Sequence, residues 1–309
     1  MLSDEPIRAI VLAISATVLF ASSDTIAKYL STSLPIAEFL WIRYALFLVM
    51  AVLLGSRQPH RLLRPRNTGL QVARGICVVL SSILFVHGVR QMSMAQATSI
   101  NFLSPILITV LSVPLLRETV GLRRWAAVGA GMLGMLVIVR PGLSGFEPAA
   151  LFGVGGAFCW ALALIITRMI AVSDAPETTV FWSAGIGTLV LSTLLPLEAA
   201  WPSWRQLGLS LLLGSLASGG QWGIILAHRH APASLLAPFF YIQLLWASAL
   251  GFLVFGSRPD GWTLIGAGII IASGLYTAHR ERVRGRMARG EPRLAGLRPV
   301  PGTPPGTKG

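Results

Sequence analysis

The sequence predicts an all-α integral membrane protein of ten transmembrane helices, arranged as two inverted five-helix repeats. Three observations support this fold class: the apolar composition, the spacing of the apolar segments and an internal repeat. Of the 309 residues, 54% are hydrophobic and only 12% are charged, and the mean hydropathy is +0.70. A water-soluble domain cannot bury that much apolar surface, so the composition indicates contact with lipid.

Apolar segments long enough to cross a bilayer follow one another along most of the chain. A spanning helix needs about 20 mostly apolar residues. The predicted helices are 9–29, 36–54, 70–88, 95–116, 122–139, 149–170, 179–195, 207–227, 234–255 and 262–278. Asp4 and Glu5 precede the first segment, which has neither a basic start nor a small-residue cleavage site. This pattern favours a retained helix over a signal peptide.

The two halves of the chain share residues in the same order. The matched positions, offset by 137 to 141 residues, are Phe20 and Trp160, Lys28 and Arg168, Pro35 and Pro176, Trp41 and Trp182, Trp125 and Trp262, Gly129 and Gly266, and Gly131 and Gly268. We therefore expect a first five-helix repeat over 7–140 and a second over 149–279. Because five is odd, the second repeat enters the membrane from the opposite side. Inverted repeats suit transport by alternating access.

The net charge of +13 is distributed in a way that indicates membrane topology and not nucleic-acid binding. With the N-terminus inside, nineteen basic residues fall on the inner side and four on the outer side. The positive-inside rule then places both termini in the cytoplasm. Residues 280–309 are rich in Arg, Gly and Pro, which predicts a disordered basic cytoplasmic tail in contact with anionic membrane lipids.

The sequence lacks the motifs of the common catalytic sites. It contains no H-E-x-x-H, G-x-S-x-G or P-loop motif. Gly129-Ala-Gly131-Met-Leu-Gly134 matches a dinucleotide motif, but no strand precedes it, and glycines in membrane helices serve close packing. Cys77 and Cys159 fit small buried hydrophobic positions. We predict no catalytic residue, metal or cofactor, and keep a membrane-embedded enzyme acting on a lipid or peptide, or a channel, as alternatives.

Polar and ionisable side chains inside the predicted helices are the candidate site. A charge at the bilayer centre costs roughly 2.5 to 3.5 kcal/mol, so these groups should face the protein interior. The candidate substrate-binding residues are these groups together with the aromatic Trp160. They are Asp24, Lys28, Arg43, Asn101, Trp160, Gln221, Tyr241 and Gln243. The alternative for Arg43 is an interfacial or structural ion pair, for example with Glu38. The alternative for the three amides is an interhelical hydrogen bond.

Asp24 and Lys28 lie one helical turn apart, with the acid on the N-terminal side, where such a pair is favourable. Lys28 can reach the outer interface, whereas Asp24 lies about one turn deeper and needs a partner or a wet cavity. They form either an anchoring pair or a site in which Asp24 contacts a cationic group of the cargo or takes up a coupling proton. Pro105 and Pro238, in equivalent helices, mark either paired kinks beside the substrate route or ordinary bends.

Several motifs together resemble the EamA-type permeases of the drug/metabolite transporter superfamily, over roughly residues 7 to 280. They are Trp41-Ile-Arg43, Ala97-Thr-Ser-Ile-Asn-Phe-Leu-Ser-Pro105, Leu116-Arg-Glu118 leading to Trp125, Val139-Arg-Pro-Gly142, Ala237-Pro238-Phe-Phe-Tyr241 and Phe255-Gly256-Ser257. Ser257 stands where such proteins typically have a glutamate. These motifs identify the scaffold and not the cargo.

The resemblance implies a ten-helix basket around a central cavity lined mainly by helices 1, 3, 4, 6, 8 and 9. Helices 5 and 10 would lie at the periphery, often in contacts of a homodimer kind. Cargoes in the family include amino acids, vitamins such as riboflavin, S-adenosylmethionine, metallophores and drugs. We therefore expect a secondary transporter of a small metabolite in the bacterial inner membrane, working by alternating access with no enzymatic step.

Overall fold

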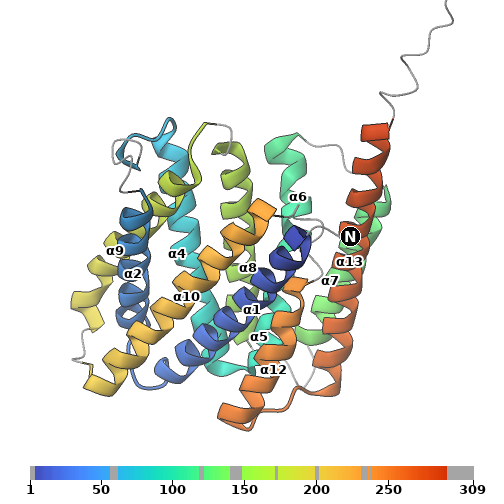
Figure 1. Ribbon diagram of the computed structural model, residues 1–309. Helices are drawn as coiled ribbons and strands as arrows, with labels where there is room; N and C mark the ends of the chain where they lie inside the picture. Colours follow the sequence, from blue (N-terminus) through green and yellow to red (C-terminus); the bar gives the residue numbers. More distant parts are fainter. Residues whose placement is uncertain are drawn as a thin grey trace, which may run out of the picture.

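The computed structural model describes residues 4–55, 62–117, 122–139, 148–170, 173–198, 202–230, 236 and 239–290, and over these residues it contains helices and no strand (Figure 1). The helices of the first half are α1 (Asp4–Leu30), α2 (Ile36–Gly55), α4 (Thr68–Gln91), α5 (Met94–Asn101), α6 (Ser104–Leu116) and α7 (Leu122–Val139). Those of the second half are α8 (Ala149–Ile170), α9 (Pro176–Glu198), α10 (Trp204–His230), α12 (Ile242–Phe255) and α13 (Gly261–Gly290).

The described helices have the length and surface of membrane spans. Six segments are long and apolar enough to cross a bilayer: Ile7–Leu30, Ile36–Leu53, Thr68–Gln91, Met94–Leu116, Ala149–Ile170 and Glu177–Pro196. Large apolar side chains point outward, among them Leu53, Leu133 and Leu253, which are 68%, 62% and 75% exposed. Water disfavours such a surface, whereas lipid tails accept it. The chain is therefore a multi-pass membrane protein.

The fourth predicted helix is divided in two, which the sequence did not predict. Phe102 and Leu103 separate α5 from α6 within the predicted segment 95–116. The cause is Pro105, which has no N–H to donate to the Asn101 carbonyl one turn earlier. The Ser104 hydroxyl donates a hydrogen bond to that carbonyl instead, at 2.7 Å. The proline thus gives a short break and a second helix, not a simple bend.

The last helix is longer than predicted. α13 continues to Gly290, so the beginning of the segment 280–309, expected to be disordered, is helical. The arginines of this region, Met287 and Ala288 favour helix, and no proline lies between Gly261 and Pro292. Residues 291–309 lie outside the described part of the chain.

The helices pack in pairs that join the two halves of the chain. α1 lies along α10, α4 along α8, α2 along α9 and α7 along α13, and Figure 1 shows the last two pairs at opposite sides of the bundle. Glycine allows the closest approaches. A Cβ at Gly156 of α8 would lie 3.3 Å from the backbone of Phe85 in α4, and one at Gly220 of α10 would lie 3.3 Å from the Ala16 carbonyl oxygen in α1. Small residues at helix contacts are typical of membrane bundles.

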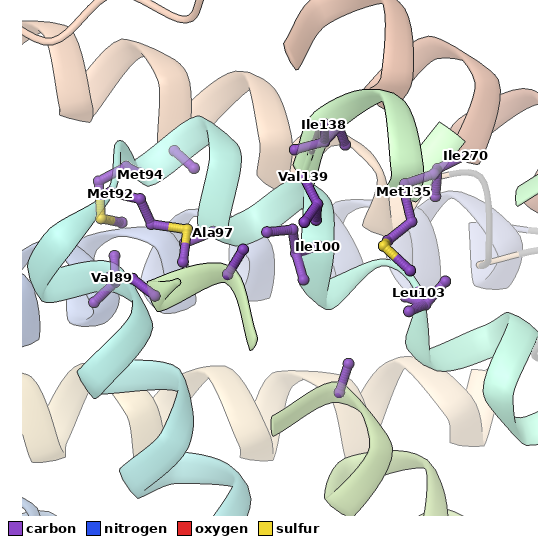
Figure 2. Packing of buried hydrophobic residues seen from close by; sticks show 14 of the residues in the cluster. Val89, Met92, Met94, Ala97, Ile100, Leu103, Met135, Ile138, Val139 and Ile270 are labelled. Atoms are coloured by element: carbon purple, nitrogen blue, oxygen red, sulfur yellow. The ribbon is translucent and has the colours of Figure 1, made fainter. Parts of the chain in front are cut away.

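A buried apolar cluster around α5 holds α7 and α13 against the central helices. Figure 2 shows Met94 and Ile100 of α5 among side chains that include Met135 and Ile138 of α7 and Ile270 of α13. Since lipid tails are as apolar as these side chains, the stabilisation comes from close van der Waals packing more than from removal from water. The α7–α13 pair is thereby fixed at the side of the bundle.

Candidate substrate-binding cavity

A cavity of about 570 Å³ lies inside the bundle. Its walls come from α1, α2, α4, α5, α6, α8, α9, α10 and α12, while α7 and α13 add only Val128 and Ser273. The family resemblance implied a wall from the first, third, fourth, sixth, eighth and ninth predicted helices, which correspond to α1, α4, α5 with α6, α8, α10 and α12. The structure adds α2 and α9, which are the second and seventh predicted helices. A cavity of this size is typical of sites for small organic molecules.

Seven of the eight candidate site residues line this cavity. They are Asp24, Arg43, Asn101, Trp160, Gln221, Tyr241 and Gln243. They come from both halves of the chain, and Asp24 and Gln243 are 219 residues apart in sequence. The cost of polar groups in lipid explains why these side chains turn inward.

Lys28 lies elsewhere, although it is only one turn from Asp24. Its ammonium group donates a hydrogen bond to the carbonyl of Met92, the C-terminal cap residue of α4. The same group lies 5.1 Å from the centroid of the Phe255 ring, at the end of α12. Carbonyls at helix ends lack partners within the helix and attract such a cation. Lys28 therefore connects three helices and is not part of the cavity wall.

Asp24 and Gln243 connect α1 with α12 inside the cavity. The amide nitrogen of Gln243 lies 3.5 Å from the Asp24 carboxylate, which makes a long hydrogen bond. Arg43 of α2 is close enough to Asp24 to interact with it electrostatically. The Arg43 guanidinium lies 5.9 Å from the centroid of the Phe47 ring, and its buried Nε has no hydrogen-bond partner among the described residues.

Two helix ends meet at the cavity through their aromatic residues. Phe102 lies in the break between α5 and α6, and Tyr241 directly precedes α12. Their ring centroids are 5.0 Å apart, with the ring planes tilted by 56°. Irregular backbone at membrane depth is tolerated where it lines a cavity, and Pro105 lies in this wall. Pro238 lies outside the described residues, so the expected pairing of two proline kinks is seen on one side only.

Two arginines of the cavity wall, Arg74 of α4 and Arg168 of α8, were not among the candidate site residues. Sequence reasoning counted both as charges of the inner side. One signal pointed inward for both, because Arg74 lies inside the predicted helix 70–88 and Arg168 inside the predicted helix 149–170.

Arg74 is held in place by hydroxyl and carbonyl groups of two neighbouring helices. Its Nε donates to the Thr167 hydroxyl of α8 at 2.6 Å. Its Nη1 donates to the Thr179 carbonyl of α9 at 3.3 Å and to the Ser183 hydroxyl. These bonds fix the direction in which the guanidinium faces the cavity.

Comparisons with known proteins agree over nearly the whole chain. The EamA-like transporter family model matches twice, over residues 7–140 and 147–277. A riboflavin transporter from Vibrio cholerae is 30% identical over 297 residues, which cover 92% of this chain and 97% of that protein. An S-adenosylmethionine uptake transporter from Rickettsia felis is 26% identical over 85% of this chain and 89% of its own length. A pseudopaline exporter from Pseudomonas aeruginosa is 25% identical, with 85% and 93% covered.

One solved protein crystal structure has the same fold. It covers 89% of this chain and 98% of its own, with a TM-score of 0.62 and 18% sequence identity. The helical bundle, the interior cavity and the double family match thus point the same way. The chain belongs to the EamA-like transporter family and is a transporter of small molecules, not an enzyme.

Proposed function

We propose that this protein is a secondary transporter of the bacterial inner membrane that moves a small metabolite by alternating access. The main support is the cavity of about 570 Å³, whose wall combines charged, amide and aromatic side chains from both halves of the chain. Such a wall can replace the hydration of a polar molecule and also contact its apolar parts. The charge distribution along the sequence supports a cytoplasmic position for both termini.

The pairing of helices supports ten spans in two inverted halves. α1 and α8 begin the two family-matched segments, and α4 and α10 are the third spans of those segments. α1 packs on α10, and α8 packs on α4. A first span on the third span of the other half, seen twice, is the arrangement that a pseudo-two-fold axis produces. Alternating access would then exchange the conformations of the two halves around the cavity.

Further assignments complete this proposal. Asn101, Gln221 and Gln243 supply amide groups for polar parts of the cargo, and Trp160 and Tyr241 supply aromatic surface. Membrane lipids, or a second copy of the chain, would cover the outward apolar side chains of α7 and α13. The relatives are named for different cargoes, so riboflavin, S-adenosylmethionine and pseudopaline are starting compounds for a test and not assignments.

The test is transport by purified protein in proteoliposomes, over a panel of vitamins, nucleoside derivatives, amino acids and metallophores. We expect one compound class to be transported above the level of empty vesicles. Asn101→Ala, Trp160→Leu, Gln221→Ala and Tyr241→Leu should change its rate or the preference among compounds more than they change expression. If the parent moves no compound in the panel, or if all four variants match the parent with every compound moved, the proposed cavity function is wrong.

A further inference from the structure

We infer that the cargo is an organic anion with a flat aromatic ring, whose carboxylate or phosphate group binds between Arg43 and Arg74. This inference rests on the proposed function, because it names the cargo class of the same cavity. The starting observation is charge. Among the described residues the cavity wall holds Arg43, Arg74 and Arg168 against a single carboxylate, Asp24. Even without Arg168, Asp24 can offset only one of the charges of Arg43 and Arg74, so this wall carries excess positive charge.

Such an excess is costly inside a membrane protein unless an anion offsets it. Lys28 shows how this chain treats a cation that serves packing, since a carbonyl oxygen and an aromatic ring surround its ammonium group. Arg43 differs, because its Nε is buried without a hydrogen-bond partner in the described part of the chain. Buried polar groups normally have partners, so an unsatisfied donor at a cavity wall points to a ligand.

Arg74 has the geometry of a preorganised anion site. The hydrogen bonds to Thr167, Thr179 and Ser183 use Nε and Nη1 of the guanidinium. No hydrogen bond to a described residue uses Nη2. A guanidinium that the protein holds in position loses little freedom when it binds a carboxylate or phosphate.

Both arginines lie near the same tyrosine. The hydroxyl of Tyr44 in α2 is close to the guanidinium groups of Arg43 and of Arg74. Its hydroxyl is hydrogen-bonded to the Ser82 hydroxyl at 2.9 Å and to the Val78 carbonyl at 3.1 Å, so the ring is fixed between α2 and α4. One anionic group placed beside Tyr44 can therefore interact with both guanidinium groups.

The remaining wall explains the aromatic part of the inference. Phe20, Phe47, Phe85, Phe102, Trp160 and Tyr241 line the cavity. Aromatic side chains prefer offset or edge-to-face contacts with other rings, and Phe102 and Tyr241 already form such a pair, with centroids 5.0 Å apart. A flat ring with an acidic substituent satisfies both the aromatic surface and the arginines.

The experiment uses two pairs of probes, and the members of each pair share a ring and differ in one acidic group. Riboflavin 5′-phosphate is compared with riboflavin, and indole-3-acetate is compared with indole-3-acetamide. Binding to the purified full chain is measured by titration calorimetry, and uptake is measured in proteoliposomes. We expect an anionic probe to bind at least about tenfold tighter than its neutral partner, as charge-assisted contacts to two arginines require. The two pairs show whether the site prefers phosphate or carboxylate.

Variants assign the preference to the two arginines. Arg43→Gln and Arg74→Gln should reduce the ratio of anionic to neutral affinity to near one, and Arg43→Lys should restore part of it. Arg90→Gln removes an exposed arginine of the same helix as Arg74 and should leave the ratio unchanged. Size-exclusion chromatography shows that each variant is folded. If Arg43→Gln fails to fold, Arg43→Lys and Arg74→Gln still decide.

The inference is overturned if the parent binds neither anionic probe, if neutral and anionic probes bind equally, or if Arg43→Gln and Arg74→Gln both keep the preference. Transport of a neutral compound without any preference for anions would overturn the inference and leave the proposed function intact. Failure to transport every probe and every compound of the wider panel would overturn the proposed function itself.

Discussion

α1 and α8, the first helices of the two family-matched segments, have the same packing role but carry different charges. α1 lies along α10 and α8 lies along α4, in both cases at contacts that contain glycine. Phe20 of α1 and Trp160 of α8 both line the cavity, and so do Asp24 and Leu164, which lie four residues further along each helix. The position that holds a carboxylate in one half therefore holds a leucine in the other. The packing repeats while the electrostatics do not, so the chemistry of the cavity depends on individual residues and not on the repeat.

α7 and α13 also share a sequence motif, but their glycines make close contacts at different positions. Both carry the sequence Trp-x-x-x-Gly-Ala-Gly. In α13 the first glycine, Gly266, is crowded, while a side chain at Gly268 would meet nothing within 4 Å. In α7 the order is reversed, because Gly129 is open and Gly131 is crowded by Ile106 and Ser273. The repeated motif thus marks helices that pack closely, but the contact itself forms at different positions.

The largest expected effect tests this packing difference. A Cβ at Gly266 would lie 2.5 Å from the Gly134 carbonyl oxygen, which is backbone and cannot move aside easily. Gly266→Val should therefore destabilise the protein by about 1 to 3 kcal/mol or more, as overpacking does. Gly268→Val is the matched control on the same helix and should have little effect. Thermal unfolding in detergent measures both, and equal midpoints would show that α7 and α13 do not pack through Gly266.

The second test concerns the charge that α8 lacks. Asp24→Asn keeps the size of the side chain and removes its charge beside Arg43 and Gln243. We expect normal insertion but a loss of most transport, or of its dependence on pH, because the side chain would no longer take up a coupling proton or bind a cationic group that the cargo carries besides its acidic group. Lys28→Gln should be milder, since Lys28 lies outside the cavity wall.

Uptake of the identified cargo between about pH 5.5 and about pH 8 decides, because this interval covers the range in which a membrane carboxyl can change its protonation. Transport by Asp24→Asn at the parental rate throughout would make Asp24 a structural residue. A stronger loss in Lys28→Gln than in Asp24→Asn would reverse the proposed roles of the two residues.

The sequence predicted the helices well because lipid imposes simple rules on length and composition. The predicted segments 122–139 and 149–170 coincide with α7 and α8. The break at Phe102 was not predicted, since a proline in a membrane helix gives either a bend or an interruption according to the side chains that satisfy the freed carbonyl. Here the Ser104 hydroxyl does so within the chain.

The sequence predicted the candidate site best where a polar side chain falls at a depth that lipid would otherwise surround. Asn101, Gln221 and Gln243 lie in the middle of apolar segments, so the cost of exposure to lipid indicated the interior. Arg74 and Arg168 were missed because a charge near a helix end fits either a loop or a cavity, and only the packing of neighbouring helices decides. Lys28 was predicted in the site but lies outside the cavity wall. Helical spacing predicts the direction of its side chain but not its partner, the carbonyl of Met92.

The smallest expected effect concerns the ends of α6 and α12, where the backbone conformation of the cap is the same but the residue differs. Arg117 and Gly256 both cap their helices in the left-handed conformation, with φ of 55° and 66°. For a residue other than glycine, this conformation lowers the stability of the folded state by roughly 1 kcal/mol. Arg117→Gly should therefore raise stability by about 0.5 to 1 kcal/mol, reduced by the greater freedom of glycine in the unfolded chain. Gly256→Ala should lower stability by a similar amount through backbone strain alone, because a Cβ there would meet nothing within 4 Å. Unfolding midpoints of the two variants measure these effects, and shifts of the same sign in both would show that the two helices do not end in equivalent caps.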